Sequence, residues 1–296
     1  MKKVFLLSTD HLENGLWFRD LEDFKVAMNY VAILAAQTPE VIVLAFILMS
    51  NHVHFLLKGK EEDVTAFVER FKARYSLYYR RKYGVRELLR RNHVDTQEIP
   101  TGYNGKADEK EAFEKAVAYV QMNCVAANIC AHPSQYAWGT GATFFNPSPH
   151  GGIPLSNLSA RARMRLFRSD SVDLPEDWRV CEGGYILPSE YVDIKTVEDC
   201  FRSPQRMDFF LRNSSKAKKR IQGDQNLPAF RDQTILAAVP DLCFSLFGRV
   251  SFSELTASEQ AEFARQIRYR FSADPNQIAR VCGISYEQAA HLLDSF

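Results

Sequence analysis

The chain has 296 residues, of which 46% are hydrophobic and 25% are charged. These proportions are those of a folded globular protein of about two domains, and they exclude a disordered, collagen-like or coiled-coil chain. The formal net charge is only +1, so a histone-like polycation is excluded, and any contact with nucleic acid must come from a local patch.

The N-terminal part of the chain predicts a strand, a helix and two further strands. Residues 3–8 are apolar and β-rich and predict the first strand. Apolar side chains then recur at helical spacing over residues 20–37, and Asp20 is a suitable N-cap. Residues 41–49 are almost entirely apolar, which predicts a central strand, and residues 52–57 follow as its antiparallel partner.

The next segment predicts a long helix over residues 64–83, a weak strand over 97–103 and a helix over 108–129. The complete order is then β-α-β-β-α-β-α. This order predicts an α+β fold, a ferredoxin-like split βαβ sandwich in which helices cover an antiparallel sheet. The fold hosts many functions and therefore does not determine one.

A dense run of prolines and glycines at residues 146–154 predicts a domain boundary near residue 150. Residues 1–150 would form the first domain, and residues 151–296 a mainly helical accessory domain. Within the latter, residues 254–294 contain the spacing of a helix, a tight glycine turn and a second helix, which is typical of a helix-turn-helix. The six cysteines are scattered without a CxxC pair and predict reduced, mostly buried thiols.

His52 and His54 are the first candidate site residues. Side chains at i and i+2 of a strand point to the same face, so both imidazoles could bind one divalent metal while Val53 packs behind them. The alternative is a pair of strand histidines with local hydrogen-bond partners.

Tyr119 and Asn123 are the second candidate pair. They are i, i+4 neighbours on the predicted helix 108–129 and therefore share one face. An amide oxygen together with two imidazoles is a suitable ligand set for Mg²⁺ or Mn²⁺. On this helix alone, both residues could equally be ordinary boundary residues.

Four short segments within about residues 1–145 resemble the motifs of one family. Residues 48–57 read LMSNHVHFLL, close to the LMPNHVHLLL of the REP-associated tyrosine transposases, a group of the HUH single-tyrosine transposases. Residues 16–24, 119–125 and 135–139 resemble the family's (I/L)FxxxxDF, YIxxNPV and DYPWSS segments. Ser50 and Cys124 replace usual prolines, and the family's GxLFxGRFK segment is not recognisable. The resemblance covers about half of the chain.

The resemblance implies that His52 and His54 bind a divalent metal, Mg²⁺ or Mn²⁺, with Asn123 as the third ligand. It also implies that Tyr119 attacks single-stranded or hairpin DNA to give a 5′-phosphotyrosyl intermediate and a free 3′-OH. Because the phosphotyrosine conserves the bond energy, a DNA 3′-OH can reverse the step without ATP. The implied enzyme is a metal-dependent single-tyrosine transposase, acting as a DNA endonuclease and ligase.

A basic and aromatic surface is predicted on the helix 64–83, where it could contact backbone phosphates and stack on unpaired bases. Its basic members are Arg70, Lys72, Arg74, Arg80, Arg81 and Lys82. Without a nearby nuclease site, the same pattern is typical of a solvated helix face. In the predicted helix-turn-helix, Tyr286 and Gln288 would begin a recognition helix, although Glu287 between them is unfavourable near phosphates.

Other functions share these features. A catalytically silent DNA-binding protein on the same scaffold would need neither the paired histidines nor the tyrosine. A metal-dependent phosphodiesterase would stay active without Tyr119, and a replication initiator shares the HUH chemistry. No export signal is visible and the longest apolar run is about half of a membrane span. We therefore expect a cytoplasmic, nucleoid-associated protein, with no membrane partner and with homodimer formation left open.

Overall fold

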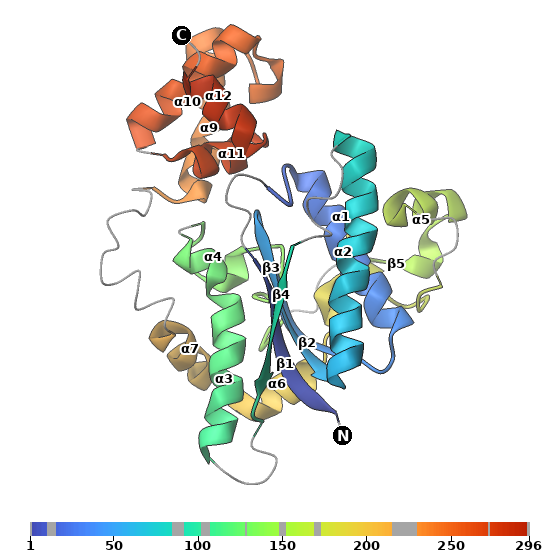
Figure 1. Ribbon diagram of the computed structural model, residues 1–296. Coiled ribbons are helices and arrows are strands. Elements are labelled where there is room, and N and C mark those ends of the chain that lie inside the picture. The colour runs from blue at the N-terminus through green and yellow to red at the C-terminus, as the bar shows by residue number, and fades with distance from the viewer. Residues whose placement is uncertain are drawn as a thin grey trace.

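The computed structural model describes residues 2–10, 16–84, 92–101, 107–127, 129–147, 152–168, 173–214, 230–271 and 273–294 (Figure 1). The strands of the main sheet are β1 (Lys3–Thr9), β2 (Ile42–Met49), β3 (His52–Gly59) and β4 (Val94–Ile99). The helices beside it are α1 (Leu21–Gln37), α2 (Glu61–Tyr83), α3 (Ala107–Gln121) and α4 (Asn123–Ala126). The following elements are β5 (Ile153–Pro154), α5 (Ala160–Phe167), β6 (Arg179–Val180), α6 (Ile194–Phe201) and α7 (Pro204–Asn213). The C-terminal helices are α9 (Asp232–Phe247), α10 (Ala257–Phe271), α11 (Pro275–Cys282) and α12 (Tyr286–Asp294).

The four long strands form one antiparallel sheet in the order β2-β3-β1-β4. With the chain order β1-α1-β2-β3-α2-β4, this is the ferredoxin-like arrangement, so the predicted fold class is confirmed. Helices α1 and α2 cover one face of the sheet and α3 covers the other (Figure 1). Phe55 of β3 packs against Phe67 and Phe71 of α2, with ring centroids 5.9 and 5.4 Å apart. Because strand side chains alternate, the neighbouring His54 faces α3.

Two predicted boundaries were wrong. Strand β4 begins and ends three or four residues before the predicted 97–103, and Pro100, which cannot donate to a strand ladder, follows its last residue. The predicted helix 108–129 is interrupted, because α3 ends at Gln121 and the chain resumes as α4 after a turn at Met122.

The N-cap of α1 is confirmed, since the Asp20 carboxylate accepts a 2.9 Å hydrogen bond from the Asp23 backbone N–H.

The outer edge of β2 is covered by a later segment of the chain, residues 138–140. The Leu48 N–H donates to the Trp138 carbonyl at 2.8 Å, and the Thr140 N–H donates to the Phe46 carbonyl at 3.0 Å. Between them, Gly139 lies so close to the strand that an added Cβ would be 2.7 Å from the Phe46 carbonyl oxygen. The segment that resembles DYPWSS therefore closes a sheet edge that would otherwise expose unpaired backbone groups.

The buried hydrophobic side chains of the described residues fall into two cores. The first contains both faces of the sheet and continues through Leu155, Phe167 and Phe201 to Leu211. The second is built from α9 to α12, between Ile235 and Ala289. The described residues between Leu155 and Leu211 thus share the core of the sheet, and the two cores divide between residues 211 and 235. The assignment of a domain boundary near residue 150 stays a prediction.

Helices α11 and α12 follow one another across Gly283, whose φ of 66° favours glycine, and their assignment as a helix-turn-helix stays a prediction. One residue of the N-terminal part belongs to their core: Leu16 is buried among the C-terminal helices, while Trp17 and Phe18 are buried in the first core. Both Trp17 and Phe18 donate their N–H groups to the Ser50 carbonyl, at 2.7 and 3.1 Å. The segment Leu16 to Phe18 therefore joins the C-terminal bundle to the turn that precedes His52.

The structure has all six cysteines as free thiols, of which Cys124, Cys130 and Cys243 are buried and the other three are partly buried. By length and composition alone, one helical stretch of the described residues, Asp232–Glu254, could cross a membrane. A single stretch of this kind is weak evidence of a membrane span, since core helices of soluble proteins can have the same length and apolar composition. In this chain 22% of the most apolar part of that stretch is buried, and Ile235, Leu242 and Cys243 belong to the second core.

Candidate active site

Strand β3 presents His52 and His54 on the face of the sheet that α3 covers. Their ring centroids are 4.8 Å apart, and both side chains are buried. Each ring is held at Nδ1: Ser8 Oγ lies 2.6 Å from Nδ1 of His54, and Asn51 Oδ1 lies 2.9 Å from Nδ1 of His52. Ser8 stands directly opposite His54 in the register of β1 and β3. Histidines that bind metals are typically oriented through one nitrogen in this way, and Nε2 would then be the ligand atom.

The C-terminal end of α3 brings Tyr119 to these histidines. The Tyr119 and His54 ring centroids are 5.3 Å apart, in an edge-to-face arrangement at 76°. Asn123 is buried, and its side-chain amide donates to the carbonyls of Tyr119 and Val120 at 2.8 and 3.2 Å. The amide oxygen therefore points away from these two carbonyls. The i, i+4 relation of Tyr119 and Asn123 persists across the break between α3 and α4.

The residues present fit a divalent metal of the predicted kind. Among the described residues, no group of three or more His, Cys, Asp or Glu could hold a metal ion. A metal here would therefore need the mixed set of two imidazoles and the Asn123 amide oxygen. Such nitrogen and oxygen donors suit Mg²⁺ or Mn²⁺ and leave coordination positions for phosphate oxygens. The ligand roles of His52, His54 and Asn123 stay predictions.

The environment of Tyr119 disfavours its ionised form. Burial raises the pKa of the Tyr119 phenol above its usual value, and the negative charge of Asp95 on β4 raises it further. The hydroxyl is therefore protonated at neutral pH. An attack by its oxygen requires a group that accepts the proton or a cation that stabilises the phenolate.

Comparisons with known proteins give two matches. The family model described as "Transposase IS200 like" matches residues 22–122, which include both histidines and Tyr119 and end one residue before Asn123. This segment is thus similar to the IS200-like transposases. A solved structure of a REP-associated tyrosine transposase bound to a REP hairpin is 12% identical, covers 60% of this chain and 86% of that chain, and gives a TM-score of 0.35. A search of the curated proteins finds no match.

The basic side chains of α2 lie across the sheet from Tyr119, because α2 and α3 cover opposite faces (Figure 1). Lys72 is only 2% exposed, and its Nζ donates to Glu69 at 2.8 Å and to the Asn92 carbonyl at 2.5 Å. An ammonium group held inside the protein cannot reach a phosphate. The prediction that Lys72 contacts DNA therefore disagrees with the structure.

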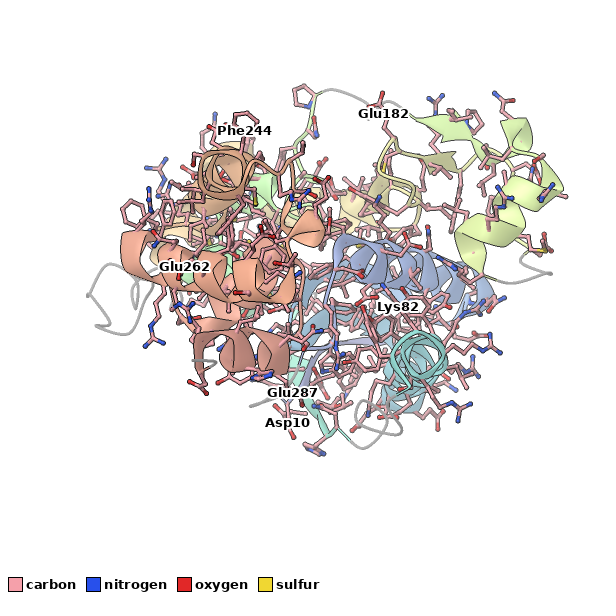
Figure 2. The ribbon with its side chains drawn as sticks, turned by 90° about the horizontal axis from the view of Figure 1, so that it is seen from above. Asp10, Lys82, Glu182, Phe244, Glu262 and Glu287 are labelled. Carbon is pink, nitrogen blue, oxygen red and sulfur yellow. The ribbon has the colours of Figure 1, made fainter. Side chains whose placement is uncertain are left out.

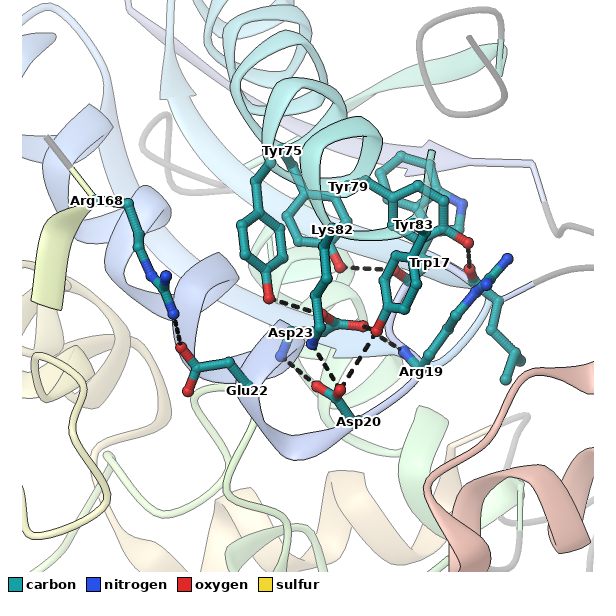
Figure 3. Close-up of polar contacts among 12 residues, drawn as sticks. Trp17, Arg19, Asp20, Glu22, Asp23, Tyr75, Tyr79, Lys82, Tyr83 and Arg168 are labelled. Atoms are coloured by element: carbon teal, nitrogen blue, oxygen red, sulfur yellow. Dashed lines mark hydrogen bonds and ion pairs between the residues drawn. The ribbon is translucent and has the colours of Figure 1, made fainter. Parts of the chain in front are cut away.

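Two other basic residues of α2 also have partners within the protein. Lys82 Nζ lies 2.6 Å from Asp20 and 2.8 Å from Asp23, as Figure 3 shows. The Arg74 guanidinium lies 4.8 Å from the centre of the Tyr30 ring. The remaining residues of the predicted DNA-binding surface are exposed, and their contact with DNA stays a prediction: Arg70, Arg80 and Arg81.

The predicted recognition helix is α12. Gln288 is exposed, but its Oε1 accepts a 2.9 Å hydrogen bond from the Ser285 N–H and so caps α12. Tyr286 packs partly against the second core. Burial raises the pKa of Tyr79 on α2, the Arg19 guanidinium opposes this shift, and the charge of Glu287 on α12 adds to it. Figure 2 shows Glu287 on the side of the C-terminal helices that faces Asp10. DNA reading by Tyr286 and Gln288 stays a prediction.

Sequence reasoning missed the groups that hold the two histidines. Asn51 directly precedes His52, and Ser8 is a polar residue at the end of an otherwise apolar strand. Both signals were visible, but assigning Ser8 to His54 requires the strand register. That register depends on the pairing of β1 with β3, which is a long-range contact.

Proposed function

We propose that this chain is a metal-dependent, single-tyrosine transposase that cleaves and rejoins single-stranded or hairpin DNA. The main support is the convergence of His52, His54 and Tyr119 on one face of the sheet, with successive ring centroids 4.8 and 5.3 Å apart. The match of residues 22–122 to the family model of IS200-like transposases supports a transposase activity. A silent binding protein would need no such convergence of a nucleophile with two potential metal ligands.

In the proposed reaction, the Tyr119 oxygen attacks a DNA phosphorus atom and loses its proton. A tyrosyl phosphoester bond forms, the bond from phosphorus to the 3′ oxygen breaks, and that oxygen takes up a proton to become a free 3′-OH. The DNA segment downstream of the cut stays attached to Tyr119 through its 5′ phosphate. Attack of a DNA 3′-OH on this phosphotyrosine reverses the step, so one site both cleaves and rejoins DNA.

His52, His54 and Asn123 would hold the metal, which when bound supplies positive charge to the phosphate and to the developing phenolate. Ser8 and Asn51 orient the two imidazoles through Nδ1. Because Tyr119 is partly buried against the first core, its oxygen is positioned before DNA arrives.

The test uses single-stranded and hairpin oligonucleotides from the genomic flanks of the gene, labelled at the 5′ or the 3′ end. With Mg²⁺ or Mn²⁺, we expect a denaturing gel to show a covalent adduct that contains the 5′-phosphate side of the cut, together with a free 3′-OH fragment. Both products should disappear in excess EDTA. Cleavage without any adduct would favour a phosphodiesterase, and binding without cleavage would favour a silent DNA-binding protein.

Replacing Ser8 tests the orientation of His54. The substitution Ser8→Ala removes the hydroxyl 2.6 Å from Nδ1, and we expect it to weaken Mn²⁺ binding roughly 10-fold, as is usual when the group that orients a ligand histidine is lost. Calorimetry or Mn²⁺ electron paramagnetic resonance on the DNA-free protein measures this. Ser76→Ala, on the helix across the sheet, is the control and should bind Mn²⁺ as the wild type does. Equal affinity of all three proteins would contradict a metal role for His54.

Replacing Asp95 tests the electrostatics of Tyr119. The Asp95 charge raises the pKa of Tyr119, so Asp95→Asn should lower that pKa, although burial would keep it above the usual value. The reactive form is the phenolate, so the rate of adduct formation should rise with pH below the pKa. At any one pH it should be higher in Asp95→Asn. The difference in phenolate absorbance between chains with and without Tyr119 gives the pKa. An unchanged pKa and rate would show that the exposed Asp95 is screened by solvent.

A further inference from the structure

The segment from Leu16 to Phe18 joins the two cores of the molecule. Leu16 is 1% exposed and is the only residue before Ile235 that the described part of the chain contributes to the second core. Trp17 and Phe18 belong to the first core. Beside this contact lies a pocket of about 470 Å³, which is lined by Phe18 on one side and by residues of α9 and α11 on the other. Leu16 is therefore a discrete anchor in the C-terminal bundle rather than part of a continuous interface.

Two buried tyrosines of α2 hold the backbone of this segment. The Tyr79 hydroxyl donates to the Leu16 carbonyl at 3.0 Å, and the Tyr75 hydroxyl donates to the Trp17 carbonyl at 2.6 Å. The rings of Trp17 and Tyr75 are nearly parallel, at 13°, with centroids 6.5 Å apart. Close-packed interiors transmit small displacements because they contain little free space. A shift of the Leu16 side chain is therefore passed to the backbone N–H groups of the next two residues.

Those N–H groups lead to the candidate metal site. Trp17 and Phe18 both donate to the carbonyl of Ser50, at 2.7 and 3.1 Å, and Ser50 is buried. Two donors on one carbonyl oxygen fix its direction, and because the peptide group is planar they also fix the peptide plane between Ser50 and Asn51. The side-chain oxygen of Asn51 lies 2.9 Å from Nδ1 of His52. The orientation of the His52 ring thus depends on a carbonyl that the segment holds.

We infer that Leu16 is a positioning residue for the candidate metal site and that the C-terminal bundle orients His52 through it. The inference rests on the proposed function, in which His52 binds a divalent metal. Groups that orient a ligand histidine typically change metal affinity 10-fold to 100-fold when they are lost. Loss of the Leu16 anchor should therefore weaken metal binding although every proposed ligand is still present.

The test measures Mn²⁺ affinity of the full chain without DNA, by electron paramagnetic resonance. We expect Leu16→Ala to bind Mn²⁺ roughly 10-fold more weakly than the wild type. Leu16→Met keeps a similar volume and should restore the affinity. The matched control is Ile267→Ala, which empties an equally buried position of the second core on α10. It should lower thermal stability to a similar extent and bind Mn²⁺ as the wild type does.

Two further measurements separate positioning from general destabilisation. If Leu16 acts through Asn51, then Asn51→Ala alone should weaken Mn²⁺ binding roughly 10-fold, and adding Leu16→Ala should have little further effect. Before any metal is added, NMR spectra of isotope-labelled histidine rings should show changed nitrogen signals of His52 in Leu16→Ala and unchanged signals in Ile267→Ala. Leu16→Val removes only one carbon and should give a smaller loss of affinity in the same direction, so it replaces Leu16→Ala if that chain does not fold.

The outcomes distinguish this inference from the proposed function. Wild-type Mn²⁺ affinity in Leu16→Ala overturns the inference, while Mn²⁺ binding and adduct formation by the wild type still support the proposed function. An equal loss of affinity in Leu16→Ala and Ile267→Ala also overturns it, since bundle stability alone would then explain both. A wild type that neither binds Mn²⁺ nor forms an adduct overturns the proposed function and the inference together.

Discussion

A Tyr119→Phe chain is expected to form no covalent adduct with DNA, a loss of at least about 1,000-fold relative to the wild type. The reason is chemical, since phenylalanine lacks the oxygen that would bond to phosphorus. The ring itself should stay in place, because its contact with His54 at 5.3 Å and its packing on the first core do not need the hydroxyl. Anisotropy with a labelled oligonucleotide should therefore give the same Kd as the wild type.

The matched control is Tyr185→Phe. Tyr185 is also a partly buried tyrosine of the first core, with its ring 5.5 Å from Trp138, and it lies outside the candidate active site. It should form the adduct at the wild-type rate. If Tyr119→Phe still cleaves DNA, water rather than tyrosine is the nucleophile and the proposed mechanism is wrong. Loss of DNA binding in Tyr119→Phe would instead assign the hydroxyl to substrate contact.

The part of the molecule nearest the candidate site could be predicted from local pattern. The apolar run before His52 predicts a central strand, and the alternation of strand side chains places His52 and His54 together. The i, i+4 spacing likewise places Tyr119 and Asn123 on one helix face. These rules act over a few residues, so they need no knowledge of the tertiary structure.

The failures concern residues whose position depends on distant segments. Lys72 has the sequence context of a solvated helix face, yet it is buried because its ammonium reaches Glu69 and the Asn92 carbonyl. Leu16 stands in a motif of the first domain but is buried among the C-terminal helices. The Asn92 carbonyl is 20 residues from Lys72 along the chain, and the C-terminal helices are farther still from Leu16, so periodicity carries no information on either contact.

Replacing Asp23 is expected to destabilise the first core more than any other single change to a charged residue of α1. Asp23 is fully buried and accepts hydrogen bonds from Tyr78, Tyr83 and Lys82 at 2.8, 2.7 and 2.8 Å (Figure 3). The Asp23 carboxylate also accepts a 2.8 Å hydrogen bond from the Arg19 backbone N–H. Asp23→Ala leaves these donors without their acceptor, and the loss of one partner from a buried ionic network costs about 3–5 kcal/mol.

Urea unfolding followed by tryptophan fluorescence measures this cost in the relevant part of the chain, because Trp17, Trp138 and Trp178 all belong to the first core. Glu22→Ala is the neighbouring control. Glu22 is 47% exposed and forms a surface ion pair with Arg168, so its loss should cost no more than about 1 kcal/mol. Equal unfolding free energies for the two variants would contradict the structural role of Asp23. A large cost confined to Asp23→Ala would show that this carboxylate ties the start of α1 to the end of α2, and so fixes the segment from Leu16 to Phe18 that supports the turn before His52.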